Sequence, residues 1–310
     1  MIVVFGSINM DVHMRLQAFP KAGETVLSPA YEMSPGGKGA NQALACARSG
    51  AKTAIVGKIG DDAAGQKILG NLRRNEVMTS GAGISDDLPT GMAFVMTDKS
   101  GENQIIVASG ANAEVKSEQV PNEILNANAI VLMQMEVPVA ETLELAHRAK
   151  KQGARVILNL APAAAIPVAA LQDIDYVVVN EGEAEVLAEA IGAARGGNPL
   201  ETARAIALKG GTNCIVTLGA KGAAVLLKEG GGFYVPAMAL ENVVDTTGAG
   251  DCFCGTLAAS LYAKQDIASA LRRASVAGSL ACTKNGAQDS FPFSDEIETA
   301  LKSFPQTQAL

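Results

Sequence analysis

The stretch from Ile130 to Leu158, IVLMQMEVPVAETLELAHRAKKQGARVIL, contains two short apolar runs with a helical pattern between them. The runs Ile130–Met133 and Val156–Leu158 have the length and composition of buried strands. Between them, Val139–Gln152 repeats apolar residues at helical spacing and carries polar residues on its other face. A strand, a helix and a second strand in this order predict one unit of a parallel sheet.

The same alternation recurs along the rest of the chain. Further strands are predicted at Ile2–Phe5, Thr53–Val56, Tyr176–Val179 and Cys214–Thr217. Further helices are predicted at Ala40–Arg48, Gly65–Arg74, Glu183–Ile191 and Leu200–Leu208. Repeated units of this kind predict an α/β fold, in which a doubly wound, mostly parallel sheet is flanked by helices.

Two regions, His13–Met33 and Thr90–Val107, interrupt this alternation. The second region reads as two strands joined by a turn that contains Ser100 and Gly101. Hairpins of this kind, inserted into an α/β domain, often form a lid. No internal repeat and no Pro- or Ser-rich linker divides the sequence. We therefore predict a single domain over residues 1–310, with a small β-sheet lid contributed by about residues 12–33 and 90–107.

The bulk composition limits the classes of function. The chain has 310 residues, of which 48% are hydrophobic and 18% are charged, so it can bury a large core. The net charge of −7 argues against nucleic acid or an anionic membrane as a partner. The N-terminal residues MIVVFGSINMD have no basic region, and Gly6 and the polar residues after it end the apolar run. We therefore expect a cytoplasmic protein.

The five cysteines are odd in number and lie in segments that look core-forming, so reduced thiols are expected. Cys252 and Cys254 are two residues apart and point in different directions on a helix, so no zinc site is predicted. Only two histidines occur, His13 and His147, and we expect both to be structural or solvent-exposed.

The segment Asp245–Leu257, DTTGAGDCFCGTL, predicts a loop that binds an anion. Gly248, Ala249 and Gly250 precede an apolar helical run from Cys252 to Leu261. The first N–H groups of a helix have no partner within it, and the helix dipole places partial positive charge there. We therefore predict an anion hole that stabilises a transferring phosphoryl group.

Asp251 directly follows this loop, and two interpretations of it are open. A carboxylate in the first turn of a helix commonly caps it or complements its dipole, which is worth about 1 kcal/mol. A carboxylate beside an anion hole can also accept the proton of a hydroxyl that attacks phosphorus. Other polar residues must decide between the two.

A second glycine-rich segment, Ser34–Gly50, reads SPGGKGANQALACARSG. Its spacing matches neither a P-loop nor a dinucleotide-binding fingerprint. Glycines such as Gly37 let the backbone approach a ligand, and Lys38 and Asn41 are suited to sugar hydroxyls. A purely structural turn is the alternative.

Polar side chains also follow several of the predicted strands. Asn9 and Asp11 follow the first strand, Glu136 follows AIVLMQM, and Asn180 and Glu183 follow YVVV. Ligands of open α/β sheets bind at the carboxyl ends of strands. Asn9 and Asp11 alone could form an Asx turn that closes the strand, but the recurrence of polar residues after several strands favours a site. The segment TLGAKG, residues 217–222, could contact a nucleotide or could be an ordinary hairpin turn.

GSINMD, GGKGANQ, NEGE and DTTGAGD occur in the order and approximate spacing found in the ribokinase-like carbohydrate kinases, and the chain resembles that family over nearly its whole length. SGANAEV at 109–115 and KNGAQDS at 284–290 are more narrowly similar to its ribokinase group. The resemblance implies transfer of the γ-phosphate of ATP to the 5-hydroxyl of D-ribose, with Mg²⁺. A related kinase of deoxyribose, fructose or adenosine is the alternative.

The resemblance also implies a role for each matching position. Asp251 would be the general base, and Gly248, Ala249 and Gly250 would form the anion hole. The pentose would be bound by Asn9, Asp11, Gly37, Lys38, Asn41, Glu136 and Asp251. ATP and magnesium would be bound by Asn180, Glu183, Thr217, Gly219, Gly222, Gly250 and Ser275, although the family usually has Asn or His at the last position. A potassium site would comprise Asp245, Thr247, Ala281, Lys284, Gly286 and Ser290, with Lys284 in place of an arginine.

The resemblance further implies a homodimer, formed by pairing of the exposed lid edges. Two functions of other classes remain as alternatives. A nicotinamide-dependent dehydrogenase would use the same fold class, but the dinucleotide fingerprint is absent. A silent sugar-binding regulator would not need Asp251 beside an intact glycine loop.

Overall fold

The computed structural model describes residues 1–100 and 102–310, and its strands form one sheet of ten strands and one sheet of four. In the larger sheet the strand order is β14-β13-β12-β11-β10-β9-β8-β1-β4-β5. Its strands are β1 (Ile2–Phe5), β4 (Thr53–Gly60), β5 (Met78–Ser85), β8 (Ile130–Met133), β9 (Arg155–Asn159), β10 (Tyr176–Asn180), β11 (Asn213–Thr217), β12 (Ala223–Leu226), β13 (Gly232–Val235) and β14 (Gln308–Ala309).

The strands from β5 to β11 in this order pair in parallel, and β12, β13 and β14 add an antiparallel edge. In β1, Ile2 and Val4 belong to one hydrophobic core cluster, whereas Val3 and Phe5 belong to the other. Alternate side chains of a strand point to opposite faces, so the sheet has a core on each face.

The helices divide between the two faces of the large sheet. One face is covered by α1 (Lys38–Arg48), α2 (Ala63–Arg74), α6 (Ala249–Tyr262), α7 (Ile267–Ala281) and α8 (Ser294–Leu301). The other is covered by α3 (Val139–Lys151), α4 (Glu181–Ile191) and α5 (Pro199–Gly210). Short 3₁₀ turns occur at η1 (Gly110–Glu114), η2 (Ser117–Gln119), η3 (Asn122–Ile124), η4 (Val168–Asp173) and η5 (Gly219–Lys221). The predicted doubly wound, mostly parallel α/β fold is confirmed.

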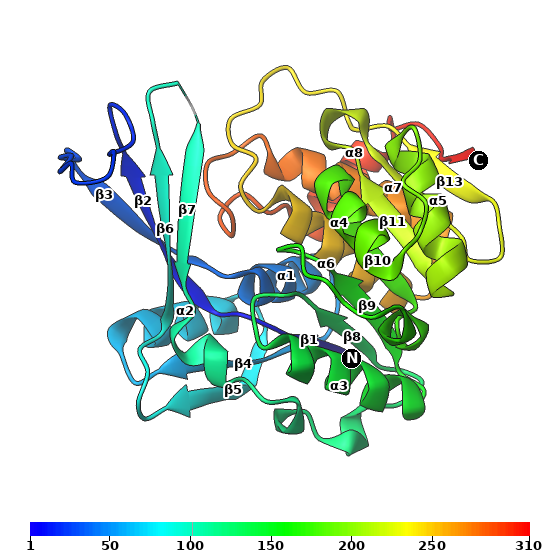
Figure 1. The fold of residues 1–310 in the computed structure, drawn as a ribbon, viewed down its shortest axis with the longest axis horizontal. Helices are drawn as coiled ribbons and strands as arrows, with labels where there is room; N and C mark the ends of the chain where they lie inside the picture. The colour runs from blue at the N-terminus through cyan, green and yellow to red at the C-terminus, as the bar shows by residue number, and fades with distance from the viewer. Residues whose placement is uncertain (101) are drawn as a thin grey trace.

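The smaller sheet, called the lid below, has the strand order β3-β2-β6-β7. Its strands are β2 (Asn9–Arg15), β3 (Tyr31–Gly36), β6 (Gly91–Thr97) and β7 (Asn103–Ala108). Figure 1 shows these strands projecting away from the helices and the large sheet. Both regions that interrupt the strand–helix alternation therefore contribute to a lid, as predicted. Of the predicted turn, Ser100 is described and Gly101 lies outside the described residues.

The structure corrects one detail of the sequence interpretation. Asn9 and Asp11 do not form a turn after the first strand, because both lie within lid strand β2. They pair with Gly36 and Ser34 of β3, so the chain passes almost directly from the large sheet into the lid. Two side chains that the sequence places before the lid are thus part of its base.

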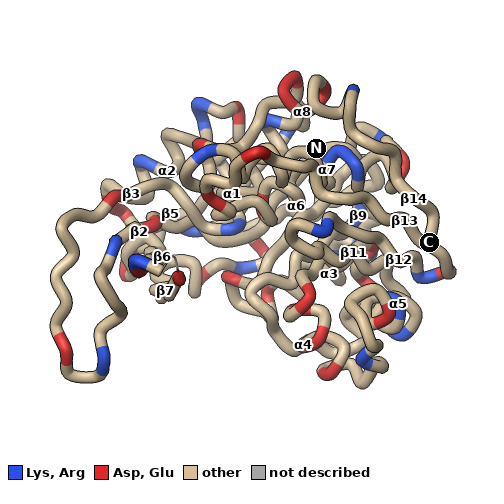
Figure 2. Tube along the Cα trace, turned by 90° about the horizontal axis from the view of Figure 1, so that it is seen from above, with Lys and Arg blue, Asp and Glu red and all other residues tan. Residues whose placement is uncertain are grey.

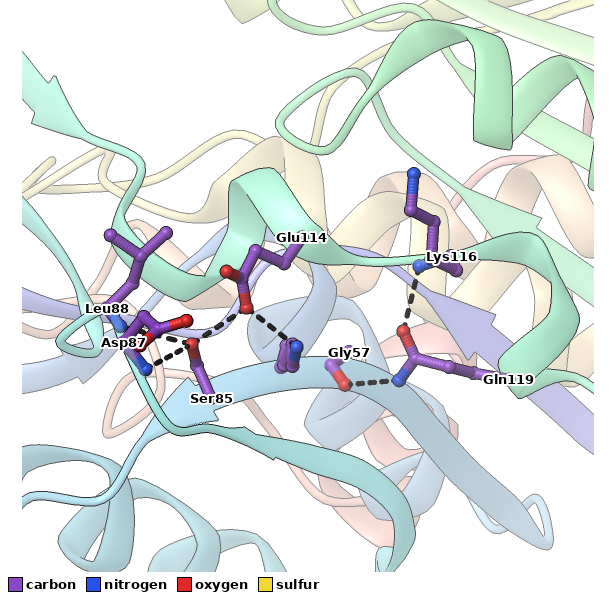
Figure 3. A network of polar contacts seen from close by, with 8 residues as sticks. Gly57, Ser85, Asp87, Leu88, Glu114, Lys116 and Gln119 are labelled. Atoms are coloured by element: carbon purple, nitrogen blue, oxygen red, sulfur yellow. Dashed lines mark hydrogen bonds and ion pairs between the residues drawn. The ribbon is translucent and has the colours of Figure 1, made fainter.

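The connection from the lid back to the large sheet is tied to its outer strands, as Figure 3 shows. Glu114, at the end of η1, accepts hydrogen bonds from Lys58 of β4 (2.6 Å) and Ser85 of β5 (2.7 Å). Gln119 donates to the main-chain oxygen of Gly57 at 2.9 Å. These contacts fix the segment after β7 against the body of the protein.

Basic and acidic residues are interspersed along the chain trace, as seen in Figure 2. The net charge of −7 is therefore not separated into large regions of one sign. Of the helices described here, none has the length and apolar character needed to cross a membrane.

Asp62 offers a test of the lid junction. Its carboxylate caps α2 through Gly65 N–H (2.8 Å) and also accepts from the N–H and hydroxyl of Thr90, each at 2.7 Å, just before β6. Burial opposes ionisation, but these hydrogen bonds prevail and lower its pKa. We expect Asp62→Ala to lower the free energy of unfolding by about 1–2 kcal/mol, as measured with urea at pH 7. Because the folded-state pKa is lowered, this difference should shrink as the pH falls through that value.

Asp266→Ala is the matched control. Asp266 caps α7 by accepting from the N–H and hydroxyl of Ser269, both at 2.9 Å and within the same helix. Asp266→Ala should lower the free energy of unfolding by less than Asp62→Ala, because Asp266 has no link to the lid. Equal losses in the two variants would contradict a role of Asp62 at the junction.

Candidate active site

The first turns of α1 and α6 bring together residues that are about 210 positions apart in the sequence. Asp251 is the third residue of α6 and is buried. Its Oδ2 accepts a hydrogen bond from Asn41 Nδ2 at 3.0 Å, and its Oδ1 accepts one from Gln42 Nε2 at 2.9 Å. The carboxylate therefore caps no N–H of its own helix in this structure, which removes the simplest structural interpretation of it.

Gly248 begins α6 in the left-handed region, with φ of 75°. A Cβ atom at this position would lie 2.8 Å from Ala287 Cβ and 2.9 Å from the Phe291 ring, so both conformation and space require glycine. Gly250 has no neighbouring heavy atom within 4 Å of its ideal Cβ position, so this side of the helix start is open. The N–H of Ala249, a predicted anion-hole donor, donates to Thr246 O at 3.2 Å.

Glu136 lies at the same edge of the sheet and connects three segments of the site. Its Oε2 accepts from the Ser7 hydroxyl at 2.6 Å and from the main-chain N–H of Lys38 at 3.1 Å. The Ser7 carbonyl accepts from Ala40 N–H at 2.9 Å. The loop after β1, the start of α1 and the segment after β8 are thereby held together.

Electrostatic coupling links the charged members of the site. Attraction to Asp251, and then to Glu136 and Glu183, raises the pKa of Lys38, although burial opposes the charge. Burial raises the pKa of Asp11 to about 7, and repulsion from Glu136 and Asp251 adds to this. The sequence predicted these side chains as one site, and the structure places them within interaction distance.

Asn9, another predicted sugar-binding residue, is buried at the start of the lid. Its Oδ1 accepts from Asn112 Nδ2 at 2.7 Å. Asn112 also bonds both main-chain polar atoms of Ile8, at 2.9 Å through its Oδ1 and 3.2 Å through its Nδ2. The strand that carries Asn9 and Asp11 is therefore fixed by the η1 segment.

Asn180 and Glu183, the predicted magnesium and phosphate residues, form a reciprocal cap at the start of α4. Asn180 Oδ1 accepts from Glu183 N–H, and Glu183 Oε2 accepts from Asn180 N–H, both at 2.8 Å. Burial raises the pKa of Glu183, with Lys38 acting in the opposite direction. The pair thus has a clear structural role, and Glu183 is also close enough to Lys38 to affect it.

The predicted nucleotide segment 217–222 forms the connection of an antiparallel hairpin between β11 and β12. Gly219 and Gly222 have positive φ values of 57° and 106°. Ser275, the other predicted nucleotide residue, is buried on α7 and donates to Pro236 O at 3.0 Å. These positions are not linked by hydrogen bonds to the Asp251 cluster in the described structure.

Three of the predicted potassium-site residues meet at one carboxylate. Asp245 Oδ1 accepts from the N–H (2.9 Å) and hydroxyl (2.7 Å) of Thr247, and Oδ2 accepts from Gly286 N–H at 2.9 Å. The Lys284 ammonium pairs with Glu296 at 3.3 Å. Ala281 ends α7, and the Ser290 hydroxyl donates to Ala287 O at 2.8 Å.

Three polar side chains of the site were quoted within motifs but not assigned a role from the sequence: Ser7, Gln42 and Asn112. Their signal was their place inside GSINMD, GGKGANQ and SGANAEV. Their hydrogen-bond partners are 92 or more residues away, except where Ser7 meets the start of α1, so no local spacing identifies them.

The two histidines and the five cysteines make no hydrogen bond to Asp251 among the described residues. His13 Nε2 is 3.1 Å from Ser34 Oγ in the lid, and His147 pairs with Asp173 at 3.1 Å on the surface. The five cysteines are unpaired, and burial raises the pKa of each thiol. Among the residues that the structure describes, no group of three or more His, Cys, Asp and Glu side chains could hold a metal ion.

Known proteins resemble both the sequence and the fold. The chain is 37% identical over 302 residues to ribokinase of Haemophilus influenzae, covering 95% of this chain and 96% of that protein. The crystal structure of ribokinase from Thermotoga maritima matches with a TM-score of 0.89 and 35% identity, over 97% of this chain and 99% of that one. Deoxyribokinase of Salmonella typhimurium is also similar, at 31% identity over 97% of this chain and 98% of that protein.

The structure of Arabidopsis thaliana ribokinase complexed with ribose and ATP matches with a TM-score of 0.87 and 32% identity, over 97% of this chain and 98% of that one. The sequence model of the pfkB family carbohydrate kinases matches residues 1–294. A match over this length, together with full-length relatives above 30% identity, shows that the chain belongs to the pfkB family of carbohydrate kinases.

Proposed function

We propose that residues 1–310 form one kinase domain that phosphorylates D-ribose at its 5-hydroxyl with ATP, giving ribose 5-phosphate and ADP. The observation that carries this proposal is the position of Asp251: a buried carboxylate at an open helix N-terminus, with Lys38 and Glu136 close by. A proton acceptor and an anion-stabilising helix end are the two groups that phosphoryl transfer to a hydroxyl needs. Because the reaction consumes ATP, we propose the cytoplasm as its location.

Several features support a polyhydroxylated pentose as the acceptor. Asn9 and Asp11 come from the lid, whereas Lys38, Asn41 and Glu136 come from the body, so a small polar ligand between them would contact both parts. A site that hydrogen-bonds each hydroxyl discriminates against a sugar that lacks one. Deoxyribose is the second candidate, because a deoxyribokinase is among the full-length relatives.

The mechanism follows from the chemistry of these residues. Asp251 accepts the hydroxyl proton as the hydroxyl oxygen attacks the γ-phosphorus; the bond from that phosphorus to the bridging oxygen of the β-phosphate breaks, and ADP leaves with the electron pair. The proton passes from the Asp251 carboxyl group to solvent when the products leave. The N-terminus of α6, with the N–H of Gly250 on its open side, stabilises the charge on the phosphoryl oxygens. The Lys38 ammonium offsets the charge of the surrounding carboxylates while the lid excludes water.

The metal ions implied by the family fit the chain differently. Glu183 is the carboxylate of the predicted nucleotide set and lies close enough to Lys38 to raise its pKa. Mg²⁺ would be held mainly by the ATP phosphates, whose charge it would neutralise. For K⁺, Asp245, Thr247, Gly286 and Ser290 offer the hard oxygen atoms that it prefers. Because the Lys284 side chain pairs with Glu296, that position would contribute its main-chain carbonyl.

A coupled ADP-release assay tests the substrate. It would compare ribose, 2-deoxyribose, fructose, adenosine and no acceptor, in the presence of ATP, Mg²⁺ and K⁺. We expect strong turnover with ribose alone. If another acceptor were preferred, that acceptor would be assigned as the substrate, and the proposed mechanism would stand. A complete lack of turnover, with ribose binding retained, would favour a sugar-binding regulator.

The role of Asp251 is tested by Asp251→Asn, which keeps the shape and removes the base. We expect ribose binding to persist while kcat falls about 10²- to 10⁴-fold, the range for a general base. Isothermal titration and steady-state kinetics would measure the two quantities. Near-normal turnover would remove Asp251 from this role.

The predicted sugar-binding residue Asp11 should lower the free energy of unfolding at neutral pH, because its carboxyl group is buried near other carboxylates. Its folded-state pKa of about 7 lies above the ordinary aspartate value of 3.8, so the unfolded chain releases this proton first as the pH rises. Ionisation of Asp11 should therefore lower the stability of the wild type between about pH 4 and pH 7. Asp11→Asn has no such carboxyl group and should not show this decrease. We expect the variant to be more stable by at least about 1 kcal/mol at pH 8, but not at pH 4.

Urea unfolding at pH 4, 6 and 8 would measure this difference, with the exposed Asp61→Asn as control. The same Asp11 variant should have a raised KM for ribose. A variant as stable as the wild type at pH 8, or one with unchanged KM, would contradict the assignment.

We also propose that a second copy of the chain covers the lid. The edge strand β7 is exposed along its length, and Ile105 and Ile106 have exposed fractions of 60% and 59%. A free apolar edge strand invites pairing with another sheet edge. We expect a dimer in sedimentation velocity at micromolar concentration and a monomer for Ile106→Lys. A monomeric wild type would exclude the proposal.

A further inference from the structure

The carboxylate of Asp251 is held by a network made only of neutral amide groups. Asn41 and Gln42 are consecutive on α1, and each donates to a different carboxylate oxygen. Two donors on two oxygens fix both the position and the plane of the carboxylate. The lone pairs that they do not use remain available for a substrate hydroxyl.

The side-chain amide of Gln42 has only one orientation that satisfies its neighbours. Its Nε2 donates to Asp251 Oδ1 at 2.9 Å and to Asn159 Oδ1 at 3.0 Å. Its Oε1 accepts from Gln134 Nε2 at 2.6 Å. A rotated amide would place its oxygen against two other acceptors and its nitrogen against a donor.

A main-chain group sets the direction of this series of hydrogen bonds. Asn159 Nδ2 donates to the Val178 carbonyl at 3.3 Å, which leaves Asn159 Oδ1 as the acceptor for Gln42. A main-chain carbonyl can only accept, so the orientation is imposed from β10 through β9 onto α1. Gln42, Gln134, Asn159 and Asp251 are all buried, so water does not compete for these bonds.

The network is not closed at Gln134. Its Oε1 is buried and is the only such side-chain atom without a hydrogen-bond partner among the described residues. An unpaired buried acceptor destabilises the fold. The same Gln134 side chain orients Gln42 through its Nε2 atom. A destabilising side chain that makes this contact argues for a role of Gln134 beyond packing.

The second carboxylate oxygen is fixed from a different part of the molecule. Asn41 Oδ1 accepts from Gln288 Nε2 at 3.0 Å, and Gln288 Oε1 accepts from Asn71 Nδ2 at 2.7 Å. The anchors of the two oxygens thus come from different elements: β9 and the segment after β8 for Oδ1, and α2 with the loop after α7 for Oδ2.

We propose that Gln42 is a positioning residue that fixes the plane of the Asp251 carboxylate toward the attacking hydroxyl, and that Gln134 holds Gln42 in the required orientation. This inference rests on the proposed role of Asp251 as general base. Because Gln42 acts through Asp251, its loss should change kcat more than the binding of sugar or ATP.

Two substitutions at Gln42 separate positioning from stability. Gln42→Met keeps the size and removes the donor, so we expect kcat to fall about 10- to 100-fold, with KM for ribose within about twofold of the wild type. Gln42→Glu places a second carboxyl beside Asp251, and like charges raise the pKa of such a pair. The acid limb of its kcat/KM profile should move upward by about one pH unit or more.

Gln119→Glu is the matched control, because its amide also bonds within the protein, to Gly57 O (Figure 3), and has no hydrogen bond to the Asp251 network among the described residues. It should leave kcat and the pH profile as in the wild type. If the Gln42 variants fail to fold, Gln134→Met decides. That change removes the unpaired acceptor of Gln134 and leaves Gln42 Oε1 unpaired instead, so Tm should change little while kcat falls several-fold.

Asp251→Asn, measured in the same assay, separates failure of this inference from failure of the proposed function. Loss of turnover in Asp251→Asn, together with wild-type kcat and pH profile in the Gln42 and Gln134 variants, would overturn the positioning role alone. Near-normal turnover in Asp251→Asn would overturn both. Reduced kcat with unchanged KM in Gln42→Met, and an unchanged Gln119→Glu control, would support the inference.

Discussion

The close contact between helices α1 and α6 is the constraint on which the site depends. A Cβ at Gly255 would lie 2.5 Å from Ala45 Cβ and 2.7 Å from Gln42 O, so any larger residue would push the helices apart. Cys46 Sγ donates to Gly255 O at 3.3 Å, and the hydroxyls of Ser49 and Thr256 are 2.9 Å apart. At this separation Asn41 and Gln42 reach Asp251, so the packing of the two helices also sets the position of this carboxylate.

Charge in the site is concentrated, with three carboxylates around one ammonium group. Asp11, Glu136 and Asp251 lie close enough to affect one another, and Lys38 is the basic group among them. Neutral amides and hydroxyls make the remaining contacts, such as Ser7 to Glu136 and Asn112 to Asn9. Neutral donors hold these carboxylates in place without a buried ion pair.

Sequence patterns were reliable where burial imposes a regular period. The strands predicted at Ile2–Phe5 and Ile130–Met133 have those bounds in the structure, because buried parallel strands are continuous apolar runs. The edge strand β5, with the sequence MTSGAGIS, was not predicted because most of its side chains are small or polar and only partly buried. Helix α7 was also not predicted, since its buried face includes Arg273 and Ser275.

By itself, the sequence determined the fold class, the two regions that form the lid, and a group of polar residues at strand and helix ends. Those features are local, because hydrophobic period and glycine-rich turns are set by neighbouring residues. Only the tertiary structure decided that both oxygens of Asp251 are held by α1, and that Gln134, Asn159 and Gln288 orient the holding amides. These contacts join segments 92 to 247 residues apart, and no local pattern encodes which buried donor meets which acceptor.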